Sequence, residues 1–163
     1  MSTTTTQSAA TQPPDLLALL LPFFEKAAPH EHRILLAMLE RFAAEHYRRW
    51  AAQEADPARK QGFLACAARE EFIAETVEGL DPNAQRIAQS LRERFPEIRQ
   101  VYADAMRPLS NEAQWKAQAA GELGGARLYR DFASAETNPD AREKLLLCVV
   151  KEEESARFLE TLA

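Results

Sequence analysis

Apolar side chains along this chain recur at steps of three and four residues over long stretches, the spacing of one face of an α-helix. One such stripe contains Leu36, Glu40, Ala43, Tyr47 and Trp50. Prolines and small polar residues interrupt these stretches, and no stretch alternates as a strand would. The pattern predicts an all-α fold with helices over about residues 14–28, 29–55, 57–78, 81–95, 96–108, 110–135 and 139–162.

The second half of the chain repeats the first at an offset of 82 residues. Between residues 40–80 and 122–162, 14 of 41 positions are identical, which is well above what this composition gives by chance. We therefore expect an internal duplication, with repeats of about 14–81 and 96–163 inside a single domain of residues 14–163.

Two pairs of long helices follow from the predicted breaks. Asp56-Pro57 and Asn138-Pro139 each combine an N-cap side chain with a first-turn proline, so one helix ends and the next begins within a few residues. Short connections make each pair an antiparallel hairpin, and about 30 residues join the two hairpins. Four long helices with one long crossover and extra short helices describe a ferritin-like four-helix bundle.

The composition limits which binding partners and which cellular location are expected for this chain. The 163-residue chain has a net charge of −5 and no dense basic stripe, so nucleic acid is not expected to bind. Residues 1–13 are polar without apolar periodicity, which predicts a disordered tail. The longest apolar run, residues 16–24, is too short to span a bilayer and lacks signal-peptide flanks, so we expect a cytoplasmic protein. Packing of this run on the bundle is favoured over docking to a membrane or a protein partner.

Glutamates lie inside the apolar stripes. Glu40 and Glu122 occupy the first and third long helices, and each has a tyrosine seven residues later, Tyr47 and Tyr129. In ferritin-like di-iron proteins, two helices each supply one Glu and the other two each supply Glu-x-x-His. Because carboxylates bridge and neutralise two cations, these positions predict a di-metal site.

The second and fourth long helices offer two sets of further ligands. Glu70 and Glu152 continue apolar stripes, whereas the line through Glu71 becomes charged further along the helix. Periodicity therefore favours Glu70 and Glu152 over Glu71 and Glu153. In neither set does a histidine follow at the third position, which holds Ile73, Ser155, Ala74 or Ala156.

Cys66 and Cys148 lie one helical turn before Glu70 and Glu152. In the predicted bundle the two cysteines fall on opposite sides of the site, too far apart for a disulfide. Each would approach the vacant histidine position of the facing helix. A thiolate ligand is one role for them, and a small buried apolar side chain is the commoner one.

The Glu-then-Tyr spacing of positions 40 and 47 resembles the first helix of the bacterioferritins and rubrerythrins. Residues 152–161 are similar to the end of a bacterioferritin fourth helix. The resemblance covers most of residues 29–162 and implies a homodimer that binds two iron or manganese ions and reacts with dioxygen or peroxide. Glu70 and Glu152 would bridge the metals, and the two tyrosines and two cysteines would lie around the ligands.

The missing histidines leave an alternative open. The chain could be a non-catalytic ferritin-like scaffold, or a partner-binding protein, that has kept the fold and lost its metals.

Overall fold

The computed structural model describes residues 13–162, and these contain seven α-helices, one 3₁₀ turn and no strand. The predicted all-α class is therefore confirmed for this part of the chain. The tail predicted for residues 1–13 lies outside the described residues, apart from Pro13. The helices are α1 (Leu16–Lys26), α2 (His32–Gln53), α3 (Pro57–Glu78), α4 (Ala84–Arg94), α5 (Ile98–Met106), α6 (Asn111–Ala135) and α7 (Pro139–Glu160).

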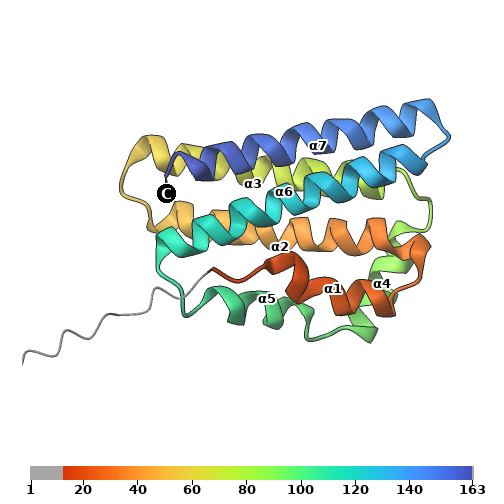
Figure 1. Cartoon of the computed structure of the whole chain (residues 1–163), viewed down its shortest axis with the longest axis horizontal. Coiled ribbons are helices and arrows are strands. Elements are labelled where there is room, and N and C mark those ends of the chain that lie inside the picture. The colour runs from red at the N-terminus through yellow and green to blue at the C-terminus, as the bar shows by residue number, and fades with distance from the viewer. Residues whose placement is uncertain (1–12, 163) are drawn as a thin grey trace, which may run out of the picture.

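The four long helices α2, α3, α6 and α7 lie side by side, and the shorter α1, α4 and α5 run along one side of them (Figure 1). α2 packs against α3 and α6 against α7, so both predicted hairpins form. α3 also contacts α7, which joins the hairpins, while α4 contacts α2 and α1 contacts α5 and α6. The segment between the hairpins therefore follows the outside of the long helices from one end to the other.

Capping side chains set several helix starts where the sequence predicted them. The Asp56 carboxylate accepts a hydrogen bond from the backbone N–H of Arg59 at 2.7 Å, and Asn138 accepts one from Asp140 at 2.9 Å. Ser110 does the same for α6. These contacts satisfy N–H groups that have no partner within the helix.

Several predicted boundaries differ from the observed ones by two or three residues. α2 begins at His32 and not at residue 29, because Pro29–Glu31 form a 3₁₀ turn in which the Glu31 carboxylate accepts from the N–H of Ala28 at 2.8 Å. α4 and α5 also begin a little later than expected, at Ala84 and Ile98.

α1 buries one face of the apolar run 16–24 against the other helices. Its buried side chains are Leu16, Leu20, Phe23 and Phe24, whereas Leu21 on the outer face is 49% exposed. Its closest helical neighbours are α5 and α6. The arrangement agrees with packing of this run on the long helices. Among residues 13–162, no helix is long and apolar enough to cross a membrane.

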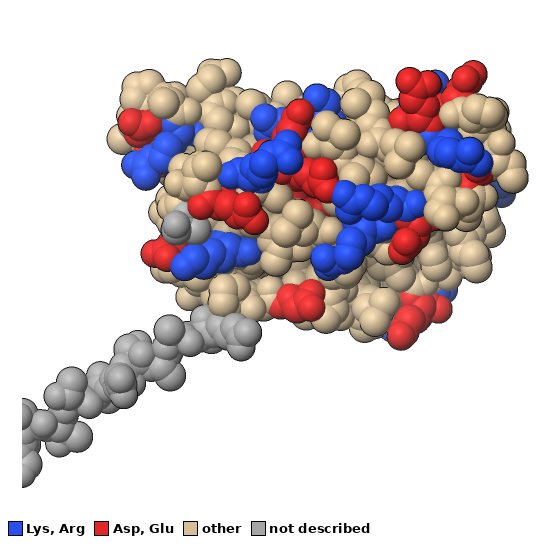
Figure 2. Space-filling view, turned by 45° about the horizontal axis from the view of Figure 1, so that its top comes forward, with Lys and Arg blue, Asp and Glu red and all other residues tan. Residues whose placement is uncertain are grey.

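Ion pairs connect the outer edges of neighbouring helices. Arg48 on α2 contacts Glu71 on α3 at 3.0 Å, and the residues 82 positions later, Arg130 and Glu153, form the same pair between α6 and α7. On the face shown in Figure 2, basic and acidic side chains lie next to one another and not in separate areas. Each exposed pair contributes little stability, but the two hairpins place equivalent pairs at equivalent positions.

We expect Asp56→Ala to lower the free energy of unfolding by about 1 kcal/mol, because the first turn of α3 loses its side-chain acceptor. Urea unfolding measures the effect. Asp131→Ala is the matched control, since it removes an exposed carboxylate near the C-terminal end of α6 and should change stability by less than about 0.5 kcal/mol. Equal losses in both variants would contradict the capping role.

Candidate metal centre

Each of the four long helices directs one glutamate into the interior. Glu40 lies on α2, Glu70 on α3, Glu122 on α6 and Glu152 on α7, and their exposed fractions are 5%, 0%, 2% and 1%. They face inward because they share the helical stripes of buried apolar residues. Removing an ionised carboxylate from water has a large free-energy cost, so four in one interior need compensation.

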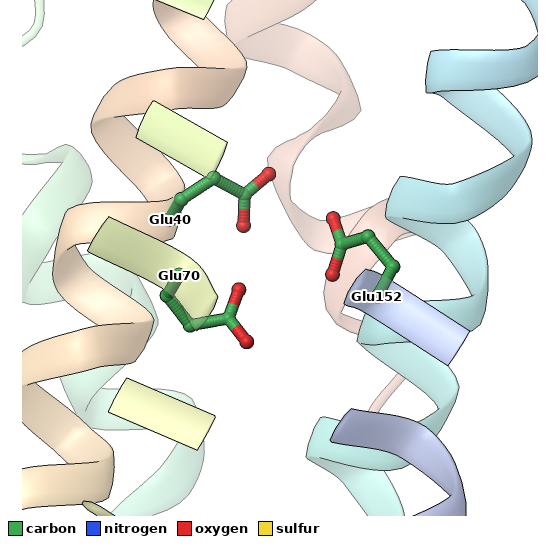
Figure 3. A group of neighbouring side chains, drawn as sticks. All are labelled: Glu40, Glu70 and Glu152. Carbon is green, nitrogen blue, oxygen red and sulfur yellow. The ribbon is translucent and has the colours of Figure 1, made fainter. Parts of the chain in front are cut away.

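Three of these carboxylates meet. One oxygen each from Glu40, Glu70 and Glu152 lies within 4.8 Å of the others. Figure 3 shows Glu40 and Glu70 on one side and Glu152 opposite them, with the carboxylates directed toward one another. Glu122 is not part of this close group, although its charge acts on Glu40 and Glu70. The four predicted ligands therefore form a close trio, Glu40, Glu70 and Glu152, with Glu122 as a neighbour.

The alternative ligands Glu71 and Glu153 lie at the outer edge of the helices. Their side chains are 26% and 32% exposed, and both are paired with arginines. Of the two ligand sets that the sequence left open, the structure places Glu70 and Glu152 in the interior and the other pair in surface ion pairs.

The two buried tyrosines cross between the hairpins. The Tyr47 hydroxyl of α2 donates to Glu122 of α6 at 2.7 Å, and the Tyr129 hydroxyl of α6 donates to Glu40 of α2 at 2.9 Å. Each tyrosine thus bonds the glutamate of the other repeat and not the one on its own helix. This reciprocal arrangement relates the halves by an approximate two-fold rotation.

The halves differ beside the remaining glutamates. The Ser155 hydroxyl donates to Glu70 at 2.9 Å. The counterpart of Ser155 at the offset of 82 residues is Ile73, which cannot donate to Glu152. Among the described residues, both oxygens of Glu152 and Oε2 of Glu70 have no hydrogen-bond partner. A buried carboxylate without donors is the strongest sign in this structure that a cation or a proton belongs there.

The sequence pattern did not predict that Gln118 and Tyr102 lie beside Glu122. Gln118 donates to Glu122 at 2.7 Å, and the Tyr102 hydroxyl donates to Gln118. Gln118 precedes Glu122 by one turn of the same helix, so helical spacing could have found it. Tyr102 comes from α5, and only tertiary packing brings it near. On the other side of the interior, the counterpart of Gln118 is Leu36, so that side is apolar.

Burial and mutual repulsion raise the pKa values of the trio. Loss of hydration, followed by the charge of Glu122, raises the pKa of Glu40 to about 8. The same two causes raise the pKa of Glu70 well above its ordinary value. For Glu152, burial and then the charge of Glu40 raise the pKa well above that of a free carboxyl. Without a cation, protons must neutralise part of this group, and a bound cation would replace them.

The cysteines and histidines stay outside the trio. Cys66 and Cys148 are free and buried, and burial raises the pKa of each thiol to about 12. Both are therefore neutral thiols at neutral pH, which agrees with the role of small apolar side chains. Of the histidines, His46 is the most buried, and burial lowers its pKa to about 4. It contacts Gln114 and Arg49, away from the glutamates.

Gly125 makes room for the carboxylate of Glu152. A Cβ atom at position 125 would lie 2.3 Å from Oε1 of Glu152, so no larger residue fits without moving that side chain. The counterpart of Gly125 in the first repeat is Ala43. The adjacent Gly124 is less restricted, because the nearest atom to its Cβ would be the end of the Leu17 side chain at 3.3 Å.

Comparison with protein-family models, curated proteins and solved structures gives no significant match for this chain. The chemistry of the donors must therefore decide what the site can hold. The trio offers only carboxylate oxygens, which are the ligands that hard divalent cations such as Mn²⁺ prefer. The unpartnered oxygens of Glu70 and Glu152 fit such an ion.

We expect Gly125→Ala to displace the Glu152 carboxylate and to weaken any cation site, without removing a ligand. Gly124→Ala is the matched control, because both substitutions raise helix propensity by about 1 kcal/mol. Urea unfolding should show a gain for Gly124→Ala and a smaller gain or a loss for Gly125→Ala. Equal gains would mean that Glu152 can move at no cost.

Proposed function

We propose that this chain is a ferritin-like helical protein that binds iron or manganese ions through Glu40, Glu70, Glu122 and Glu152. Two helical hairpins joined by a long crossover support the ferritin-like part of the proposal. The duplicated Glu and Tyr positions support it as well, because each hairpin supplies one half of the glutamates. The homodimer and the cytoplasmic location implied by the sequence stay predictions.

One observation carries the metal proposal. Glu152 is 1% exposed and directs two oxygens without hydrogen-bond partners toward Glu40 and Glu70. Removing charges from water is compensated only by opposite charge and good hydrogen bonds. No arginine or lysine forms an ion pair with this trio among the described residues, so a divalent cation supplies what the protein lacks.

The residues have distinct roles in this proposal. Glu40, Glu70 and Glu152, with the neighbouring Glu122, would hold the ions through their carboxylate oxygens. Tyr47 and Tyr129 fix the orientation of Glu122 and Glu40 by hydrogen bonds. When bound, iron or manganese would supply redox chemistry with dioxygen or peroxide. The surrounding apolar side chains exclude bulk water from the carboxylates.

The second candidate is a ferritin-like scaffold that has lost its metals. Ile73 and Ser155 favour this candidate, because they occupy the positions at which the bacterioferritins and rubrerythrins carry histidine ligands. The raised pKa values of Glu40, Glu70 and Glu152 would let shared protons take the place of the cations. The helices would then serve to present a surface to a partner.

Metal content separates the two candidates. Protein purified without chelator and reloaded anaerobically with Fe(II), or separately with Mn(II), should hold about two ions per chain by plasma mass spectrometry. The double variant Glu40→Gln/Glu122→Gln should lose most of this metal. Glu71→Gln/Glu153→Gln is the matched control at the surface and should bind as the wild type does. Wild-type protein that takes up neither ion overturns the metal proposal.

The melting temperature provides a second test. In metal-free protein we expect Glu152→Gln to raise stability by about 1–3 kcal/mol, because an amide of the same shape replaces a buried carboxyl without partners. Addition of Mn(II) should raise the melting temperature of the wild type but not that of the variant. The scaffold candidate predicts the first effect alone.

A further inference from the structure

A small cavity adjoins the carboxylates between α1, α2 and α6. Its volume is about 60 Å³. Five leucines of α1 and α2 form an apolar wall, with Leu20 and Leu36 among them, and Glu40 and Glu152 also line the cavity. The cavity therefore combines an apolar wall of leucines with buried carboxyl groups.

Residues that correspond at the offset of 82 line this cavity in pairs. Three pairs have a leucine in the first repeat and a polar or much smaller residue in the second: Leu20 with Tyr102, Leu36 with Gln118, and Leu39 with Gly121. The other two pairs are Glu40 with Glu122, which are identical, and Ala43 with Gly125. Divergence of the two repeats has thus made one side apolar and the other hydrogen-bonding, with added space beside α6.

The polar groups of the cavity define what a ligand must offer. The Tyr102 hydroxyl donates to Gln118, and the Gln118 amide donates to Glu122, so the hydroxyl and one N–H of the amide are already used. The two oxygens of Glu152 remain without partners among the described residues. A ligand that fits must therefore bring hydrogen-bond donors, and preferably positive charge, to Glu152.

We propose that this cavity binds a short primary alkylammonium ion, with its ammonium group among the carboxylates and its alkyl chain against the leucines. An ammonium group has three N–H donors and one positive charge. The oxygens of Glu152 have no donor among the described residues, and the adjacent Glu40 has the Tyr129 hydroxyl as a donor but no ion-pair partner. A metal ion would meet the same electrostatic need but would leave the leucine wall without a contact.

The size of the cavity limits the length of the alkyl chain. A single water needs about 10–15 Å³ of such space. About 60 Å³ thus accommodates roughly four non-hydrogen atoms in a row, which is the size of propylammonium. The proposal goes beyond the metal site and does not depend on it, because an organic cation binds the carboxylates of metal-free protein.

Propylamine is the probe. Chelator-treated, ¹⁵N-labelled protein at pH 7 is titrated with propylamine hydrochloride, and the backbone amide signals of Gly121 and Gly125 report binding at the cavity. We expect saturable shifts with a Kd of about 1 mM or tighter. Propan-1-ol has nearly the same shape without the charge and should bind at least about ten-fold more weakly.

Two variants locate the ligand. Gly121→Leu gives the second repeat the leucine that the first carries at position 39, fills the cavity and should abolish the shifts. Glu152→Gln keeps the shape, removes the carboxylate and should weaken binding at least about ten-fold, so the test does not depend on how Gly121→Leu folds. Leu123→Ala, an exposed leucine of the same helix, should bind as the wild type does.

Absence of saturable shifts at Gly121 and Gly125 overturns the proposal. Equal affinity for propan-1-ol, or unchanged affinity in Glu152→Gln, overturns the role of charge. These outcomes are separable from the metal proposal, because every titration uses metal-free protein and metal uptake is measured on its own.

Discussion

A carboxylate placed between packed helices must be compensated, and the interior of this protein is arranged around four of them. Two receive a tyrosine hydroxyl from the opposite hairpin, one receives a serine hydroxyl, and Glu152 receives none. Gly125 is small because the Glu152 carboxylate occupies the space of its missing side chain. The apolar stripes surrounding these groups provide the stability that lets the helices keep charge inside.

The two halves share an arrangement of helices, ion pairs and buried tyrosines but differ in individual side chains. Surface ion pairs and buried tyrosines recur at the offset of 82 residues, so they belong to the common plan. Next to the carboxylates, equivalent positions of the two halves hold different residues. The pairs are Ser155 and Ile73, Gln118 and Leu36, and Gly125 and Ala43. These changes lie around the carboxylates and the adjoining cavity, so the two sides of the interior are chemically different.

Local chemistry explains how much of the fold the sequence predicted. Asp56 and Asn138 cap their helices through contacts with residues two or three positions away, and such signals can be found without knowledge of the fold. Periodicity likewise favoured Glu70 over Glu71, because one helical turn separates a buried residue from its next neighbour on the same face. The turn before α2 was missed, since the Glu31 side chain and not the proline determines it.

The candidate site was predictable in its residues but not in its contacts. The spacing of Glu40 and Tyr47 indicated that both face inward, yet it could not show that Tyr47 bonds Glu122 on the other hairpin. Nothing in the sequence separates Glu122 from the close trio, because that distinction depends on how the four long helices pack together. The contribution of Tyr102 arises from the packing of α5 along the side of the long helices, which no local pattern describes.

The crossed tyrosines have a consequence for how such a protein can arise. A chain with only one hairpin would carry a buried glutamate whose hydrogen-bond donor belongs to another hairpin. Such a half-length ancestor could satisfy its interior only by pairing with a second copy of itself, tyrosine to glutamate in both directions. Fusion of two such copies would turn a contact between molecules into one within a molecule. Only a fused chain can carry serine in one half and isoleucine at the equivalent position of the other, because identical subunits cannot differ from each other.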